Sequence, residues 1–143
     1  MVSRRKARGI ALQLLYELDC THHKTEEVLA RLVYDESIDE ETYDFVSSLV
    51  EGVQSHRRQL DSIIEEHAPA FPVDQMAPID RTILRIALYE LVFTSSVPVK
   101  VSINEAVELA KTFGGTGTPR LVNGVLGSVV AKQQQQEGQQ ETP

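Results

Sequence analysis

Residues 79–93 read IDRTILRIALYELVF and give the clearest indication of the architecture. Wound into a helix, this stretch has apolar residues on nearly every side. A helix that is apolar all round is buried by neighbours on several sides, so a central helix is predicted here. No pattern of strands competes with this prediction, because VPVKV at 97–101 is short and contains a proline. The chain is therefore predicted to be all-α.

Amphipathic helices are predicted before and after the central one. In each, apolar residues recur at intervals of three and four, which places them on one face. These helices cover residues 7–18, 25–33, 43–67, 102–113 and 118–132. The predicted fold therefore has six or seven helices.

Length and composition set the domain organisation. The 143 residues suit one compact domain, predicted over 1–132, whereas the tail QQQQEGQQETP at 133–143 has no apolar residue for a core and is predicted to be disordered. No apolar run approaches the ~20 residues that span a bilayer, so no membrane segment is predicted. The single cysteine, Cys20, excludes an internal disulfide and fits a reducing cytoplasm.

Basic residues cluster at the start of the chain. The net charge is −7, yet Arg4, Arg5, Lys6 and Arg8 stand within a few positions of one another and the first acidic residue is Glu17. Cations are unfavourable at the N-terminal end of a helix, because the macrodipole is positive there. We infer that the four residues bind a polyanion, RNA or DNA, since the planar fork of arginine suits phosphate.

Two further residues are candidates for contact with the same ligand. Tyr16 lies two turns beyond Arg8 on the first helix and offers an aromatic ring. Arg120 lies near the N-terminus of the last helix, a position that favours anions.

No motif indicates catalysis or a cofactor. FGGTGTP at 113–119 is rich in glycine but lacks the Lys-Ser/Thr that completes a phosphate-binding P-loop. Cys20, His22 and His23 stand close together, but no second ligand pair follows at zinc spacing. We therefore predict no metal site, no cofactor and no enzyme activity.

Four segments resemble the NusB family of bacterial transcription antitermination factors. They are ARGIALQLLYEL at 7–18, ILRIALYEL at 83–91, VPVKVSINEAVELAKTFG at 97–114 and RLVNGVLG at 120–127, and the likeness extends over 3–130. The resemblance implies two packed three-helix bundles and a protein that is not an enzyme. It also implies binding of boxA RNA in ribosomal RNA operon leaders, as a heterodimer with the ribosomal protein NusE. That pair would join other Nus factors on RNA polymerase and suppress premature termination.

The resemblance also implies roles for particular residues. The RNA-contacting positions of the family correspond to Arg4, Arg5, Lys6, Arg8, Tyr16, Arg120 and Leu121. An acidic position that faces the protein partner corresponds to Asp80. The chain departs from the family pattern at Leu121, where relatives can carry an aromatic residue, and at Gly127, where the motif usually has an acid.

Two alternatives remain open at this point. In the first, the chain is a protein-interaction or self-associating module whose first helix forms a homodimer. In the second, it is a helper domain of a ribosomal RNA cytosine methyltransferase, since related helical domains accompany such enzymes. The chain has no Gly-rich nucleotide-binding unit for the reacting half of that enzyme.

Overall fold

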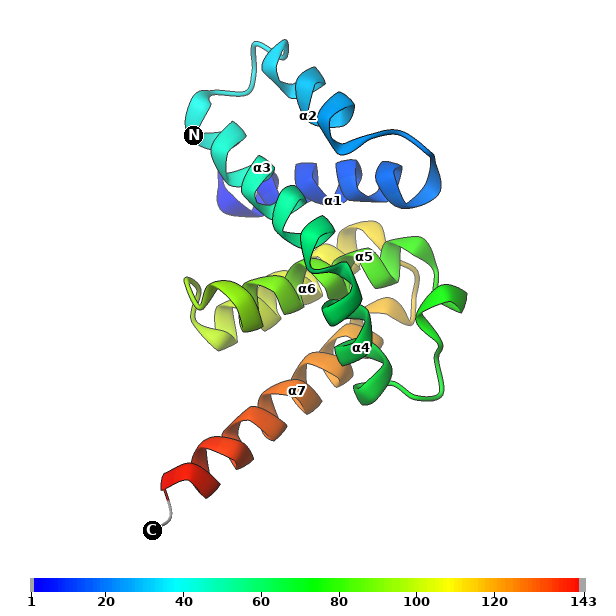
Figure 1. Ribbon diagram of the computed structural model, residues 1–143, viewed down its shortest axis with the longest axis vertical. Helices are drawn as coiled ribbons and strands as arrows, with labels where there is room; N and C mark the ends of the chain where they lie inside the picture. Colours follow the sequence, from blue (N-terminus) through cyan, green and yellow to red (C-terminus); the bar gives the residue numbers. More distant parts are fainter. Residues whose placement is uncertain (1, 142–143) are drawn as a thin grey trace.

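The computed structural model describes residues 2–141, and regular structure within that range is entirely helical (Figure 1). The α-helices are α1 (Arg4–Cys20), α2 (Thr25–Val33), α3 (Glu40–Ser55), α4 (Arg57–His67), α5 (Pro78–Leu88), α6 (Val99–Phe113) and α7 (Thr118–Glu141). A 3₁₀ turn, η1 (Val73–Gln75), precedes α5, and a π-helical turn, η2 (Tyr89–Thr94), continues it. The all-α prediction is confirmed.

The helices form two packed bundles. The first consists of α1, α2 and α3, and the second of α5, α6 and α7, with α4 packed against α5 and α7 (Figure 1). Helix α1 also packs along α5 and so joins the bundles. This arrangement confirms the predicted pair of three-helix bundles.

Helix α5 is central, as its sequence predicts. Ile83, Leu84 and Leu88 are fully buried, and α5 contacts helices of both bundles. The charged side chain of Arg85 is buried on the same helix. Because an isolated buried charge is costly, Arg85 requires a partner, which is described below.

The helix predicted over 43–67 is divided into α3 and α4 at His56. The imidazole Nδ1 of His56 lies 2.9 Å from the carbonyl oxygen of Gly52. The same ring packs 4.3 Å from that of Phe93, centroid to centroid. The backbone leaves helical geometry at His56, with φ of −109° and ψ of 14°, although the His56 amide still donates to the Gly52 carbonyl oxygen at 3.1 Å. The spacing of apolar residues contains no signal of the contact between His56 and Phe93.

Residues 133–141 differ from their prediction. The polar tail was expected to be disordered from Gln133, but α7 continues to Glu141 and its last turns extend beyond the second bundle (Figure 1). Glutamine and glutamate are good helix formers, and an existing helix grows without a new nucleation step. Residues 142–143 of the predicted tail lie outside the described residues. In the described part of the chain no helix has the length and apolarity needed to cross a membrane.

Candidate nucleic-acid interface

The four basic residues at the start of α1 separate into an exposed and a buried group. Ser3 caps the helix, because its hydroxyl accepts a hydrogen bond from the Lys6 amide at 3.1 Å. Successive helical residues point about 100° apart, so neighbours in sequence face different surroundings. Arg4, Arg5 and Lys6 are exposed, whereas Arg8 is buried.

Arg8 forms a buried ion pair with Glu90. Its Nε and Nη2 donate to the two carboxylate oxygens at 2.8 and 2.9 Å, and the side chains are only 7% and 6% exposed. The pair joins α1 to η2. This corrects the expectation that Arg8 binds RNA phosphate, because the Nε and Nη2 of its guanidinium already donate to Glu90 and its side chain is shielded from solvent.

Arg5 forms a second bidentate ion pair, with Glu105 of α6. Its Nε and Nη2 each lie 3.1 Å from a carboxylate oxygen, and its side chain is 57% exposed. The hydrogen bond from Arg5 holds the pKa of Glu105 below its ordinary value. Arg5 is therefore held in place at the surface with part of its guanidinium still open to solvent.

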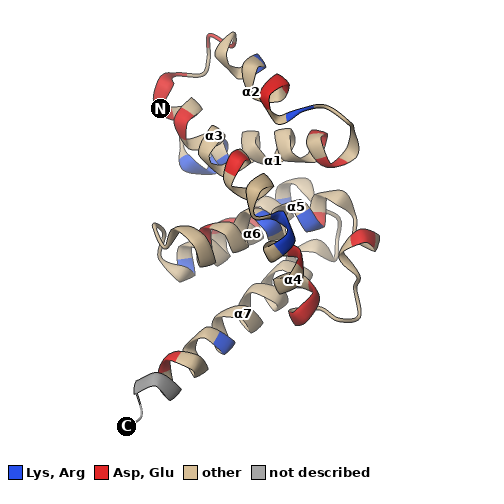
Figure 2. Ribbon diagram, in the orientation of Figure 1, with Lys and Arg blue, Asp and Glu red and all other residues tan. Residues whose placement is uncertain are grey.

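Arg4 and Lys6 complete the exposed group. The guanidinium carbon of Arg4 lies over the Phe45 ring, 4.1 Å from its centroid. A cation over an aromatic face is attracted by the ring quadrupole, which holds Arg4 against α3. Lys6 is exposed and makes no ion pair with any residue described. These side chains present positive charge at the start of α1 (Figure 2).

A groove lies between α1 and α6, beside this basic start. Its volume is about 390 Å³, and Lys6, Gly9 and Gln13 line it from α1. From α6 it is lined by Thr112 and Phe113, the residues that precede the loop to α7. We call it the α1/α6 groove. Because it begins at Arg5 and Lys6 and has an apolar floor, it can hold unstacked bases while the cations hold phosphates.

The remaining RNA-binding candidates lie outside the lining of the groove. Tyr16 is 41% exposed and continues the α1 face that carries Gln13, since residues three apart are neighbours on a helix. Arg120 is exposed on the first turn of α7, whereas Leu121 is half-buried and packs against the core. Leu121 thus has a structural contact in addition to its predicted role.

Asp80, the candidate for a partner contact, holds two helix starts together. Its Oδ1 accepts a hydrogen bond from the Thr118 hydroxyl at 2.8 Å, which ties the first turn of α5 to that of α7. The same hydroxyl accepts from the Gly115 amide at 2.9 Å and so fixes the loop that precedes α7. Asp80 is half-buried, so part of its carboxylate remains accessible.

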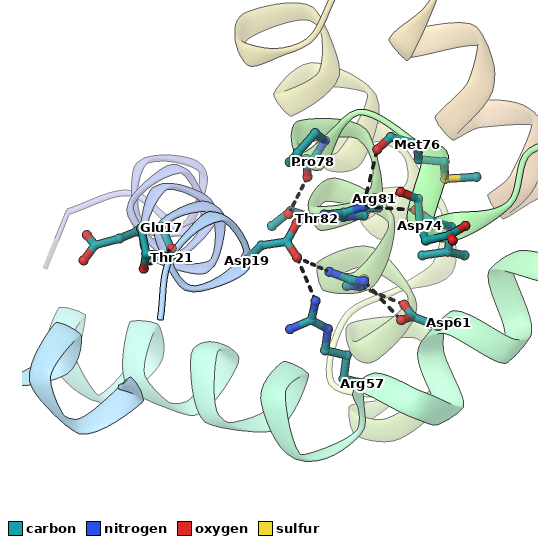
Figure 3. A network of polar contacts seen from close by, with 12 residues as sticks. Glu17, Asp19, Thr21, Arg57, Asp61, Asp74, Met76, Pro78, Arg81 and Thr82 are labelled. Atoms are coloured by element: carbon teal, nitrogen blue, oxygen red, sulfur yellow. Dashed lines mark hydrogen bonds and ion pairs between the residues drawn. The ribbon is translucent and has the colours of Figure 1, made fainter. Parts of the chain in front are cut away.

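An arginine cluster around Asp19 was not predicted from the sequence. The Asp19 carboxylate is 2% exposed and accepts from Arg57 and Arg81, each at 2.7 Å (Figure 3). Arg85 lies 3.5 Å from Asp19 and forms a bidentate pair with Asp61 at 2.8 and 3.1 Å. These contacts link α1 to α4 and α5, so they fix the bundles relative to each other. The only signal in the sequence is a pair of arginines, four residues apart, on a helix that is otherwise largely apolar.

The charges of this cluster determine the state of Asp19. Burial of the carboxylate opposes its ionisation. The hydrogen bond from Arg81 and the charges of Arg85, Arg81 and Arg57 outweigh burial and hold the pKa of Asp19 below its ordinary value. Asp19 therefore stays ionised at neutral pH.

Metal-ligating residues do not converge in the described residues. No group of three or more His, Cys, Asp or Glu side chains in residues 2–141 is placed to hold a metal ion. Cys20 is exposed at the end of α1.

Fold and surface together define a class of protein: a two-bundle helical domain whose basic first helix borders a groove with α6. The family model described as the NusB family matches residues 5–131. The chain belongs to the NusB family.

Relatives and solved structures agree with this assignment. The chain is similar to the transcription antitermination protein NusB of Dehalococcoides mccartyi strain CBDB1, with 50% identity over 127 residues, 89% of each chain. The NusB protein of Chloroflexus aggregans is 49% identical over 131 residues, 90% of this chain and 87% of the relative. The structure of T. maritima NusB superposes with a TM-score of 0.83 at 26% identity and covers 90% of both chains. A crystal structure of antitermination factors NusB and NusE in complex with dsRNA gives a TM-score of 0.78 at 28% identity and covers 88% of this chain and 94% of that chain.

Proposed function

We propose that this chain is a non-catalytic, cytoplasmic transcription antitermination factor that binds boxA RNA of ribosomal RNA operon leaders together with NusE. The observation that supports this most directly is the group of exposed cations, Arg4, Arg5 and Lys6, at the head of the α1/α6 groove. Relatives at about half identity carry the antitermination name. With NusE, the chain joins other Nus factors on RNA polymerase.

Single-stranded RNA lies from the start of α1 along the groove towards the start of α7. Arg4, Arg5 and Lys6 bind phosphates, which sets affinity and direction but not sequence. The RNA sequence is recognised where unstacked bases enter the groove and where they meet Tyr16 and Arg120 beyond its lining. NusE binds at the first turn of α5, where Asp80 is partly accessible.

The exposed cations at the start of α1 bear on the alternative of a self-associating or protein-interaction module. A homodimer or a protein-only module requires no cations at the start of α1, yet three remain exposed after Arg8 is paired. A titration of boxA RNA and a scrambled RNA, with and without NusE, separates these functions. Tight binding of boxA alone supports the proposal, whereas equal binding of both RNAs contradicts it. A dimer that ignores RNA would favour the self-associating module.

Salt dependence tests the phosphate contacts. Three exposed cations on single-stranded RNA predict that log affinity falls with log salt at a slope of about −2. Replacing both Arg4 and Lys6 by alanine should weaken binding and bring the slope closer to zero by about 1.4, because two contacts are lost. The matched control replaces Lys24 and Arg58, which are exposed elsewhere, and keeps the same net charge. If the control weakens binding as much, the cations act only through the net charge.

A further inference from the structure

A second hollow lies on the other side of Arg5, and nothing described so far uses it. Its volume is about 490 Å³, and it lies between the start of α1, α3 and the start of α6. Its lining combines Arg4 and Arg5 with Phe45, Val97, Pro98 and Val101. We propose that this hollow binds one nucleobase of the RNA strand, at the end of the strand beyond the α1/α6 groove. The inference rests on the proposed function and adds a base-binding position to it.

Arg4 and Phe45 form the stacking surface of the hollow. The Phe45 ring holds the guanidinium of Arg4 at 4.1 Å, and that of Arg8 lies 5.6 Å from the same ring centroid. RNA bases stack on aromatic rings and on arginine planes, and both are present here. The positive charge beside the stacking surface attracts the phosphate that accompanies the base.

The opposite wall is apolar and open to solvent. Val101 is 45% exposed on the first turns of α6, Pro98 is exposed, and Val97 is half-buried. An apolar wall facing an arginine suits the flat face of a base, because both surfaces of the base then leave water. This wall suits a free phosphate poorly, because the side chains of Val97, Pro98 and Val101 offer no donor.

The connector that forms this wall has an unusual backbone. It follows the π-helical turn η2, and Ser95 is left-handed, with φ of 52° and ψ of 17°. Ser95 is the single non-glycine residue with a positive φ in the described part of the chain. Such a conformation costs about 1–3 kcal/mol and is found preferentially at functional sites. The buried pair of Arg8 and Glu90 anchors η2 to α1 and so holds the wall at its distance from Arg4.

Continuity favours RNA over an acidic peptide as the occupant. Arg5 lines both the α1/α6 groove and the hollow, so a strand that leaves the groove at its basic end passes directly into it. Glu105 also lines the hollow, but Arg5 already neutralises it. An isolated peptide site would not require this shared lining.

The test uses the full chain with boxA RNA and a series of RNAs shortened by one nucleotide at each end. Val101→Glu places a carboxylate in the hollow from an exposed position, and Val33→Glu is its matched control on α2, where the side chain is 66% exposed. We expect Val101→Glu to weaken binding of the longest RNA roughly tenfold, the effect of losing one stacked base. Val33→Glu should bind as the unaltered chain does. Removing the terminal nucleotide should weaken the unaltered chain equally and weaken the Val101→Glu variant no further.

A second variant tests the aromatic ring without opening the core. Phe45→Leu keeps apolar volume but removes the stacking ring, and Phe71→Leu is its control at an exposed phenylalanine elsewhere. Phe45→Leu should lower RNA affinity with an unchanged salt slope, because no phosphate contact is lost. RNA with 4-thiouridine at successive positions should crosslink to the hollow from one terminal position only.

The outcomes separate the two proposals. If the unaltered chain fails to bind boxA RNA, both fail. If Val101→Glu and Phe45→Leu bind every RNA as the unaltered chain does, the base site is wrong and the antitermination function stands. If Val101→Glu keeps its RNA affinity but loses NusE, the hollow is a protein site and the inference is overturned.

Discussion

Replacing Arg8 by alanine is expected to destabilise the fold, even though Arg8 belongs to a cluster that resembles an RNA-binding arm. The change removes both hydrogen bonds to Glu90 and leaves that carboxylate buried, 6% exposed, without its partner. Breaking a buried ion pair from one side costs about 3–5 kcal/mol. A domain of this size has about 5–15 kcal/mol of unfolding free energy in total. The variant should therefore unfold at much lower urea concentration.

The measurement is urea unfolding followed by far-UV circular dichroism, with Arg4→Ala as the comparison. Arg4 is exposed, so its replacement should change the unfolding free energy by about 0.5 kcal/mol or less. The double replacement Arg8→Met with Glu90→Leu should recover most of the loss, because apolar residues of similar volume can substitute for a buried pair. RNA binding is measured in parallel, at a temperature where each variant is folded.

One pattern of results would refute this reasoning. It is an Arg8→Ala variant that unfolds within about 1 kcal/mol of the unaltered chain and loses RNA binding as strongly as Arg4→Ala. Arg8 would then be a phosphate contact, and the ion pair with Glu90 would contribute little to the fold.

Three further predictions follow from the packing and the charges. Gly52→Ala should lower the unfolding free energy by about 1–3 kcal/mol in the same urea assay, because the added methyl group would overlap the ring of Tyr89; unchanged stability would contradict this packing. Glu105→Gln should tighten RNA binding about threefold at low salt and leave it unchanged at high salt, since Arg5 no longer faces an anion; weaker binding would contradict it. The pKa of Asp19 is lowered, so its ion pairs stabilise the fold above about pH 4 and are lost as the pH falls through the lowered value. The unfolding free energy of the unaltered chain should therefore decline more steeply on acidification than that of the Asp19→Asn variant. If the unfolding free energies of the two proteins decline in parallel, Asp19 does not cause the loss of stability in acid.

The sequence predicts most helices correctly because burial leaves a periodic trace. Every residue of α5 from Thr82 to Leu88 is buried, so the helix is covered on all sides, and its largely apolar sequence indicates a central helix. The division at His56 leaves no such trace. At this point His56 packs against Phe93, 37 positions away, and periodicity describes only one helix at a time.

The burial of Arg8 is predictable from the sequence. Arg8 precedes Leu12 by four residues and Leu15 by seven, so all three share one face of α1. Both leucines are buried, and Arg8 lies with them. The four cations are neighbours in the sequence, but on the helix they face different surroundings. Its partner Glu90 could not be identified, because the contact joins positions 82 apart.

The partners within the Asp19 cluster, like Glu90, cannot be identified from the sequence. Two arginines on α5 indicate that buried anions must exist, because charged side chains on a buried helix need partners. Which carboxylates serve depends on the angle between the bundles. That angle is a property of the packed molecule, so the pattern of a single helix does not contain it.

Ion pairing explains how an acidic protein can present a surface for RNA. Within residues 2–141, eight of the 14 lysines and arginines pair with carboxylates, so most of the positive charge is neutralised where it stands. Of the cations left without an ion pair, Arg4 and Lys6 share the first turn of α1 beside the half-exposed Arg5. Salt screens interactions beyond about 8–10 Å, so a phosphate at that turn responds to these neighbours far more than to the distant acids. The net charge of −7 therefore limits non-specific attraction to nucleic acid, while binding at the groove depends on the local cations.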